Sequence, residues 1–90
     1  PEGWEQRLIK VAFDTGVTAW FLEPNDAAIS KYARSEPRDR EWIRAGLKIN
    51  LLSLPTIEYR LRETIMETEE RQRTVQAIKQ DQAWLISITD

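Results

Sequence analysis

The stretch Glu23–Leu47, EPNDAAISKYARSEPRDREWIRAGL, reads as a turn, a short helix, a Ser-Glu-Pro break and a second helix. Pro24 is expected to end a preceding strand, because proline cannot donate a hydrogen bond to a β-ladder. Asn25 or Asp26 is expected to cap the first free amides of the helix that follows. The stretch therefore predicts two consecutive helices with a defined start.

Sequence punctuation and apolar spacing support both helices. Ser35 is the expected N-cap of the second helix, and Glu36 and Pro37 would occupy its first turn. Apolar residues recur at helical spacing along one face of each segment. These residues are Ala28, Ile29, Tyr32 and Ala33 in the first helix, and Trp42, Ile43, Gly46 and Leu47 in the second.

The residues before Glu23 predict a β-hairpin. Residues 8–13 (LIKVAF) and 17–22 (VTAWFL) are rich in β-branched and aromatic residues, which favour strands. Asp14-Thr15-Gly16 between them matches a turn closed by a left-handed glycine. Both faces of the second strand are largely apolar. Because two strands alone are marginally stable, we expect helices, a partner or a further piece of sheet to cover this hairpin.

The residues after Leu47 predict two more helices. Ser53 and Pro55 mark the start of a third helix, which would present Ile57, Leu61 and Ile65 on one face. A fourth helix is expected from about Glu67 to Leu85. Its apolar face would carry Val75, Ile78 and Leu85, and the tail with Ile86 and Ile88 is expected to dock. The prediction is an α+β fold, a hairpin followed by about four helices, in a single domain over residues 1–90.

Composition excludes several classes of function. The chain has 90 residues, a net charge of −2 and 41% hydrophobic residues, and it contains neither Cys nor His. Disulfides, thiolate metal sites and histidine catalysis are thereby excluded. No apolar run is long enough for a membrane span, so no membrane partner and a cytoplasmic location are expected. Pro1 is compatible with a complete small protein that has lost its initiator Met and with a piece of a longer chain.

Charge is unevenly distributed along the sequence. Residues 31–48 hold six basic and three acidic residues, whereas residues 58–70 hold five acidic and two basic residues. One interpretation is two solvated faces that attract each other, within a chain or between chains. Another is that the basic segment binds a phosphate-bearing ligand. Nucleic-acid binding is disfavoured, because the whole chain is acidic and no aromatic stacking platform is evident.

A series of short motifs occurs in order along the first half of the chain. They are Gly3-Trp4 with Arg7-Leu8, Leu22-Glu23-Pro24, Asp26 with Ser30-Lys31, and Arg38-Asp39 with Trp42. In this order and spacing, Trp4–Leu47 resembles the C-terminal part of a bacterial nucleotidyltransferase-like family of unknown function. That family is related to the minimal nucleotidyltransferases of toxin–antitoxin and abortive-infection systems. Arg38 stands where relatives usually have Lys, and Trp42 where they usually have Phe.

The resemblance implies a phosphate-binding role for part of this segment. In relatives with transferase activity, the residue matching Lys31 neutralises triphosphate and the residue matching Asp39 supports the site. The expected phosphate-binding residues are Lys31, Arg34 and Arg38, with Asp26 and Asp39 as supporting residues. The alternatives are structural: Asp26 as a helix cap, and Asp39 as a brace that pairs with Lys31, Arg38 or Arg40.

The resemblance also implies that the catalytic half is missing. In the family, a Gly-Ser motif and paired aspartates on a central sheet precede the segment that this chain matches. The chain is then expected to be a noncatalytic binding or assembly module, with no cofactor of its own. As the accessory half of a larger enzyme, it would meet a nucleotide with Mg²⁺. Its partner would be the missing N-terminal half or, in a third interpretation, a second copy in a homo-oligomer.

Overall fold

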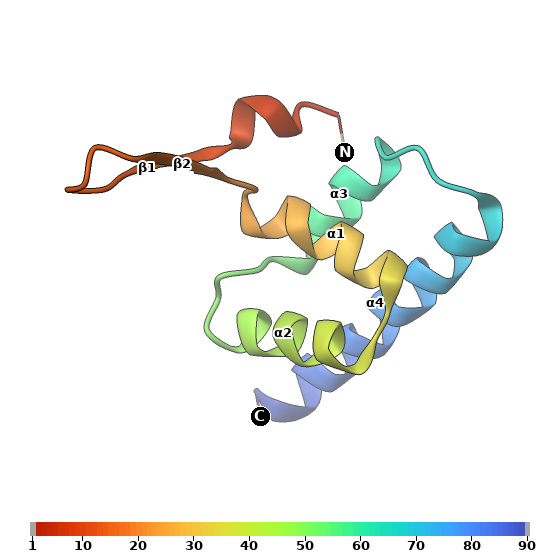
Figure 1. Ribbon diagram of the computed structural model, residues 1–90. Coiled ribbons are helices and arrows are strands. Elements are labelled where there is room, and N and C mark those ends of the chain that lie inside the picture. Colours follow the sequence, from red (N-terminus) through yellow and green to blue (C-terminus); the bar gives the residue numbers. More distant parts are fainter. Residues whose placement is uncertain (1, 90) are drawn as a thin grey trace.

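The computed structural model describes residues 2–89 and confirms the α+β prediction (Figure 1). A 3₁₀ turn and a two-stranded hairpin precede four helices. The elements are η1 (Trp4–Arg7), β1 (Ile9–Ala12), β2 (Thr18–Phe21), α1 (Pro24–Arg34), α2 (Pro37–Lys48), α3 (Leu54–Arg62) and α4 (Thr68–Ile88).

The hairpin forms where the sequence predicts it. β1 and β2 are antiparallel, with Ile9 opposite Phe21 and Ala12 opposite Thr18. Gly16 closes the connecting turn at φ 86°, a left-handed conformation that glycine adopts without strain. One face of the hairpin is apolar along its whole length. We call this the apolar hairpin face; it comprises Ile9, Val11, Phe13, Val17, Ala19 and Phe21.

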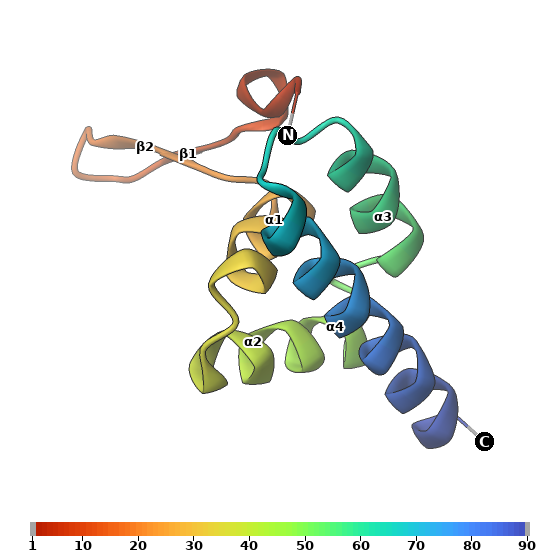
Figure 2. The same cartoon turned by 90° about the vertical axis from the view of Figure 1, so that its right-hand side faces the viewer.

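The helices leave this hairpin uncovered. It projects from the helical body to one side (Figure 1), and a view from a perpendicular direction shows the same arrangement (Figure 2). On the apolar hairpin face, Val17 is 58% exposed and Phe21 is 49% exposed. Trp20, on the opposite face, is 59% exposed. The expectation that the helices of this chain cover the hairpin is therefore wrong for the described residues.

The core lies among the four helices, with α1 in contact with α2, α3 and α4. The buried apolar residues come from all four helices and from the α2–α3 connection. They are Ala28, Ile29, Tyr32, Ile43, Leu47, Leu52, Leu54, Ile57, Leu61, Ala77 and Ile78. The first three helices thus bury the apolar faces predicted for them, apart from the half-buried Ala33 and Trp42 and the exposed Ile65. None of the helices described by the structure is both long and apolar enough to cross a membrane.

Two predicted helix caps are wrong by a few residues. α1 is capped by Glu23, whose carboxylate accepts hydrogen bonds from the backbone N–H groups of Asn25 and Asp26. α2 begins with a reciprocal capping box between Glu36 and Asp39, while Ser35 ends α1 in a left-handed conformation. In both helices a glutamate takes the N-cap position, one to three residues away from the residue expected there.

The predicted apolar faces of the last two helices are partly wrong. α3 ends at Arg62, so Ile65 lies in the connecting segment and is fully exposed. α4 extends to Ile88 and turns a different face inward, which leaves Val75 38% exposed and Ile86 67% exposed. Ile88 is exposed as well, so the tail does not dock on the described part of the chain. Polar residues that occupy the inward face of α4 account for this difference.

Candidate functional site

Three aspartates are almost completely buried: Asp26, Asp39 and Asp81 have exposed fractions of 1%, 2% and 0%. Burying a carboxylate is costly unless cations and hydrogen bonds compensate it. Each of the three meets basic side chains, and each joins elements that are separate in the fold. Four polar residues of the sequence motifs take part in these ion pairs: Arg7, Asp26, Lys31 and Asp39.

Asp26 connects the N-terminal turn to α1 and α3. Arg7 donates two parallel hydrogen bonds to its carboxylate, from Nε and from Nη2, each 2.8 Å long. Arg60 of α3 donates a third from Nη1 at 3.3 Å. The paired geometry with Arg7 is the strong, directional form of an arginine–carboxylate interaction. Asp26 is therefore an internal anchor, and the expectation that it caps α1 is wrong.

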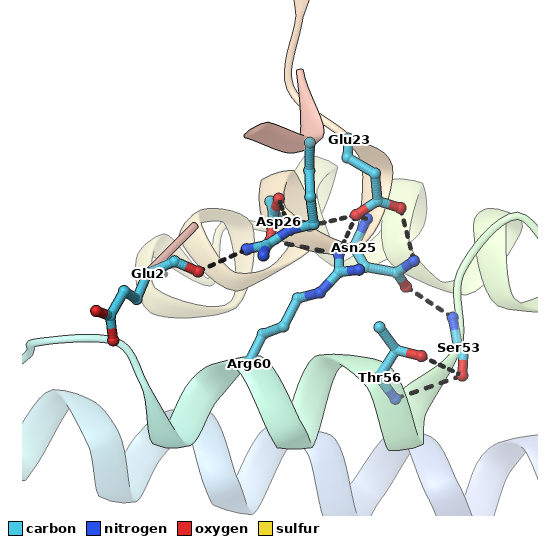
Figure 3. A network of polar contacts seen from close by, with 8 residues as sticks. Glu2, Glu23, Asn25, Asp26, Ser53, Thr56 and Arg60 are labelled. Carbon is cyan, nitrogen blue, oxygen red and sulfur yellow. Dashed lines mark hydrogen bonds and ion pairs between the residues drawn. The ribbon is translucent and has the colours of Figure 1, made fainter. Parts of the chain in front are cut away.

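The same network continues through the start of α1 to the start of α3 (Figure 3). Glu23 accepts hydrogen bonds from Arg60 and, at 2.8 Å, from the Asn25 amide. The Asn25 side-chain oxygen accepts from the backbone N–H of Ser53 at 2.8 Å, and Ser53 caps α3 as predicted. Burial alone would raise the pKa of Glu23, but hydrogen bonds from Asn25 and Arg60 outweigh it and lower that pKa.

Asp39 holds the junction between α1 and α2. Arg34 donates to it from Nε at 2.8 Å and from Nη2 at 2.6 Å, and the Glu36 backbone N–H donates at 3.2 Å. These contacts, the Arg34 hydrogen bond first among them, lower the pKa of Asp39 to about 2. Lys31 lies 3.8 Å away as a second cation. Asp39 thus braces the two helices. This agrees with the structural alternative, in which Lys31 is one of the expected partners.

The three expected phosphate-binding residues have different environments. Lys31 is half-buried, and its Nζ lies 4.8 Å from the centre of the Trp42 ring. Arg34 is committed to Asp39. Arg38 is exposed on α2 and forms no ion pair within residues 2–89. The expected supporting residue Asp26 belongs to a separate network from this group.

Asp81 is a site residue that sequence reasoning missed. Its Oδ2 accepts a 2.6 Å hydrogen bond from the buried Tyr32 hydroxyl, and its Oδ1 accepts from Arg44 at 3.0 Å and from Arg40 at 3.3 Å. Burial and this hydrogen bond raise the pKa of Tyr32. The available signal was spacing: Thr74, Ala77, Ile78 and Asp81 recur at i, i+3, i+4 and i+7 and are all buried.

Carboxylates that are paired with arginine join elements together, which is a structural role. Within residues 2–89, no three His, Cys, Asp or Glu side chains lie close enough to hold a metal ion. Fold and ion pairs together define an α+β protein with a protruding hairpin, in which buried aspartate–arginine pairs connect the N-terminal turn and the four helices.

Comparison with known proteins identifies the family. A family model described as a nucleotidyltransferase of unknown function (DUF6036) matches residues 1–87. The chain therefore belongs to this family, and the match covers the motifs of the first half and the helices after Leu47, as far as the last turn of α4. No curated protein and no solved structure matches the chain.

Proposed function

We propose that this chain is an accessory module of a nucleotidyltransferase, a binding and assembly unit that does not carry out the transfer itself. Family membership supports the link to nucleotidyl transfer. That reaction uses carboxylates that hold divalent metal ions. Here Asp26, Asp39 and Asp81 are each occupied by arginine. On this proposal, residues 1–90 form one domain, and the metal-binding aspartates belong to protein outside it.

The exposed apolar face of the hairpin is the observation that best supports an assembly role. Its apolar face exposes Ile9, Phe13, Val17 and Phe21 to between 42% and 58%. Covering each of these half-exposed side chains is worth about 1 kcal/mol. The hairpin also has unpaired outer edges, because its sheet contains only two strands. We propose that the sheet of the catalytic part receives this hairpin, adding strands and covering its apolar face.

A nucleotide-phosphate contact by Lys31 is the second candidate, and one observation favours it. Arg34 makes the short hydrogen bonds to Asp39, whereas Lys31 approaches that carboxylate only to 3.8 Å. The amine is therefore free to turn toward a phosphate group without unpairing Asp39. ATP or CTP with Mg²⁺ should then raise the melting temperature. Lys31→Ala should abolish the shift, and the matched exposed-site variant Lys48→Ala should keep it.

The noncatalytic part of the proposal is tested by incubating the ninety-residue chain with labelled nucleotide, Mg²⁺ and RNA. The expected result is no transfer above the protein-free blank. Transfer that rises with protein concentration and survives repeated purification would contradict the proposal. Light scattering of the same preparation addresses the homodimer alternative, since a stable dimer would favour a second copy as the partner of this chain.

A further inference from the structure

A groove of about 420 Å³ lies between α3 and α4, on residues to which the proposed function assigns no role. Its floor is apolar and consists of Leu61, Val75 and Ile78. Leu61 and Ile78 are buried in the core, so the floor is fixed, while Val75 remains 38% exposed toward the groove. This volume is within the range of small-molecule sites, which are mostly apolar with a few polar groups at the margin.

The rim of the groove is positively charged. It carries Arg62 from α3 and Arg71 and Lys79 from α4, and none of these three cations forms an ion pair within residues 2–89. Most other arginines of the described chain are paired with a carboxylate. Among the described residues that line the groove, Glu58 alone carries a carboxylate, and it accepts a hydrogen bond from Gln82. The groove therefore has a surplus of positive charge beside an apolar surface.

Arg71 is held in position before any ligand arrives. Its Nη1 donates to the Leu61 carbonyl oxygen at 2.8 Å, and its Nη2 donates to the Thr64 carbonyl oxygen. These acceptors are carbonyl oxygens and not carboxylates, so the guanidinium has no counter-charge from a side chain within residues 2–89. Because the side chain is already ordered, an anion bound there would cost little further side-chain entropy.

We infer that this groove binds a small amphiphilic anion, a carboxylate with an aliphatic or aromatic tail. The tail would cover Val75 on the apolar floor, and the carboxylate would meet Arg71 with Arg62 or Lys79. A second copy of the chain is a poorer occupant, because a two-fold interface through this groove would bring the same three cations against each other.

Sodium decanoate, below its micelle concentration, is a suitable probe for the ninety-residue chain. In ¹⁵N NMR titrations we expect saturable shifts at the backbone amides of Leu61, Val75 and Ile78. The double variant R62Q/K79Q should weaken binding at least fivefold, since both side chains are exposed and their loss leaves the core intact. The matched variant K48Q/R73Q changes the net charge equally at exposed positions away from the groove and should bind as the original chain does.

Two further arms make the result decisive. Val75→Glu places a carboxylate on the floor and should abolish the shifts at Leu61 and Ile78. The uncharged 1-decanol should bind at least fivefold more weakly than decanoate. Equal binding of the two amphiphiles, equal weakening by both double variants, or shifts confined to hairpin residues such as Phe13 would each overturn the inference.

Discussion

At the scale of single residues, Asp26 shows how one buried carboxylate can hold three elements together. It accepts hydrogen bonds from Arg7 of η1 and Arg60 of α3 while lying in the first turn of α1. Removing one partner of a buried ion pair leaves the remaining charges uncompensated, at a cost of several kcal/mol. The residue is therefore central to how the N-terminal turn is attached to the helices.

We predict that Asp26→Asn lowers the free energy of unfolding by about 3 kcal/mol, because Arg7 loses its counter-charge and Arg60 keeps only Glu23. Urea denaturation at neutral pH measures this change. Asp14→Asn, the same substitution in the exposed hairpin turn, should stay within about 0.5 kcal/mol of the original. Similar losses for the two variants would show that the Asp26 network contributes little.

The depressed pKa of Asp39 leads to a prediction of how the stability of the protein changes in acid. The folded-state pKa of Asp39 is about 2, below the ordinary value of 3.8, chiefly because of the Arg34 hydrogen bond. A depressed pKa contributes stability that is fully present above the unfolded-state value and is lost as pH falls through the folded-state value. We expect this contribution to be complete above about pH 4 and to fade toward pH 2.

Carboxyl NMR titration of Asp39 measures this pKa directly. Arg34→Gln should move the Asp39 midpoint upward and reduce the loss of stability between pH 4 and pH 2. Arg38→Gln, which removes a nearby exposed arginine without an ion pair to Asp39, should leave the midpoint unchanged. An Asp39 midpoint near 4 in the original chain would contradict the geometry described above.

The sequence predicts residue environments only where local pattern determines them. Ser53 caps α3 and Gly16 closes the hairpin turn as predicted, because both depend on neighbouring residues alone. Asp81 shares a helical spacing with buried neighbours on α4, but that spacing does not show that a carboxylate is buried there, because its partners Tyr32, Arg40 and Arg44 come from other helices. The roles of Lys31 and Arg38 toward phosphate stay predictions.

At the scale of elements, the order of hairpin and helices could be predicted because proline and glycine mark the boundaries. Pro24, Pro37 and Pro55 all lie in the first turn of a helix. The inward face of α4 could not be predicted from apolar residues alone. Thr74 and Asp81 occupy that face, while Val75 is largely exposed. When polar residues are buried because they have partners on other elements, the apolar residues alone no longer show which face of a helix points inward.

The end of α2 gives a prediction at this scale. A Cβ atom added to Gly46 would lie 2.7 Å from Leu52 Cδ1 and 2.8 Å from its Cγ, and Leu52 is buried. Gly46→Ala should therefore destabilise the protein by about 1 kcal/mol: overpacking costs about 1–3 kcal/mol and exceeds the gain of up to about 1 kcal/mol in helix propensity.

Thermal or urea denaturation measures the effect of Gly46→Ala, with the double variant Gly46→Ala/Leu52→Ala as its control. In the double variant the added methyl group should no longer destabilise, when compared with Leu52→Ala alone. An increase in stability from Gly46→Ala alone would show that α2 and the segment after it are less tightly packed than the distances indicate.

At the scale of the whole molecule, the chain has two parts that differ in how well their apolar side chains are buried. The four helices bury a shared core, whereas the hairpin leaves an apolar face uncovered. Membership in a nucleotidyltransferase family and this uncovered hairpin lead to the same proposal, in which a catalytic part receives the hairpin. The α3–α4 groove is a separate surface, so decanoate binding and hairpin assembly can succeed or fail independently.

The most direct measurement is isothermal titration of the ninety-residue chain with a catalytic segment from a family member that carries the Gly-Ser motif and paired aspartates. We predict a 1:1 complex that the double variant Phe13→Thr/Val17→Thr weakens at least tenfold, because both substitutions lie on the apolar hairpin face. The matched variant Lys10→Thr/Ala12→Thr, on the opposite face of β1, should have a smaller effect. No complex, or a complex indifferent to Phe13→Thr/Val17→Thr, would contradict the proposed assembly role.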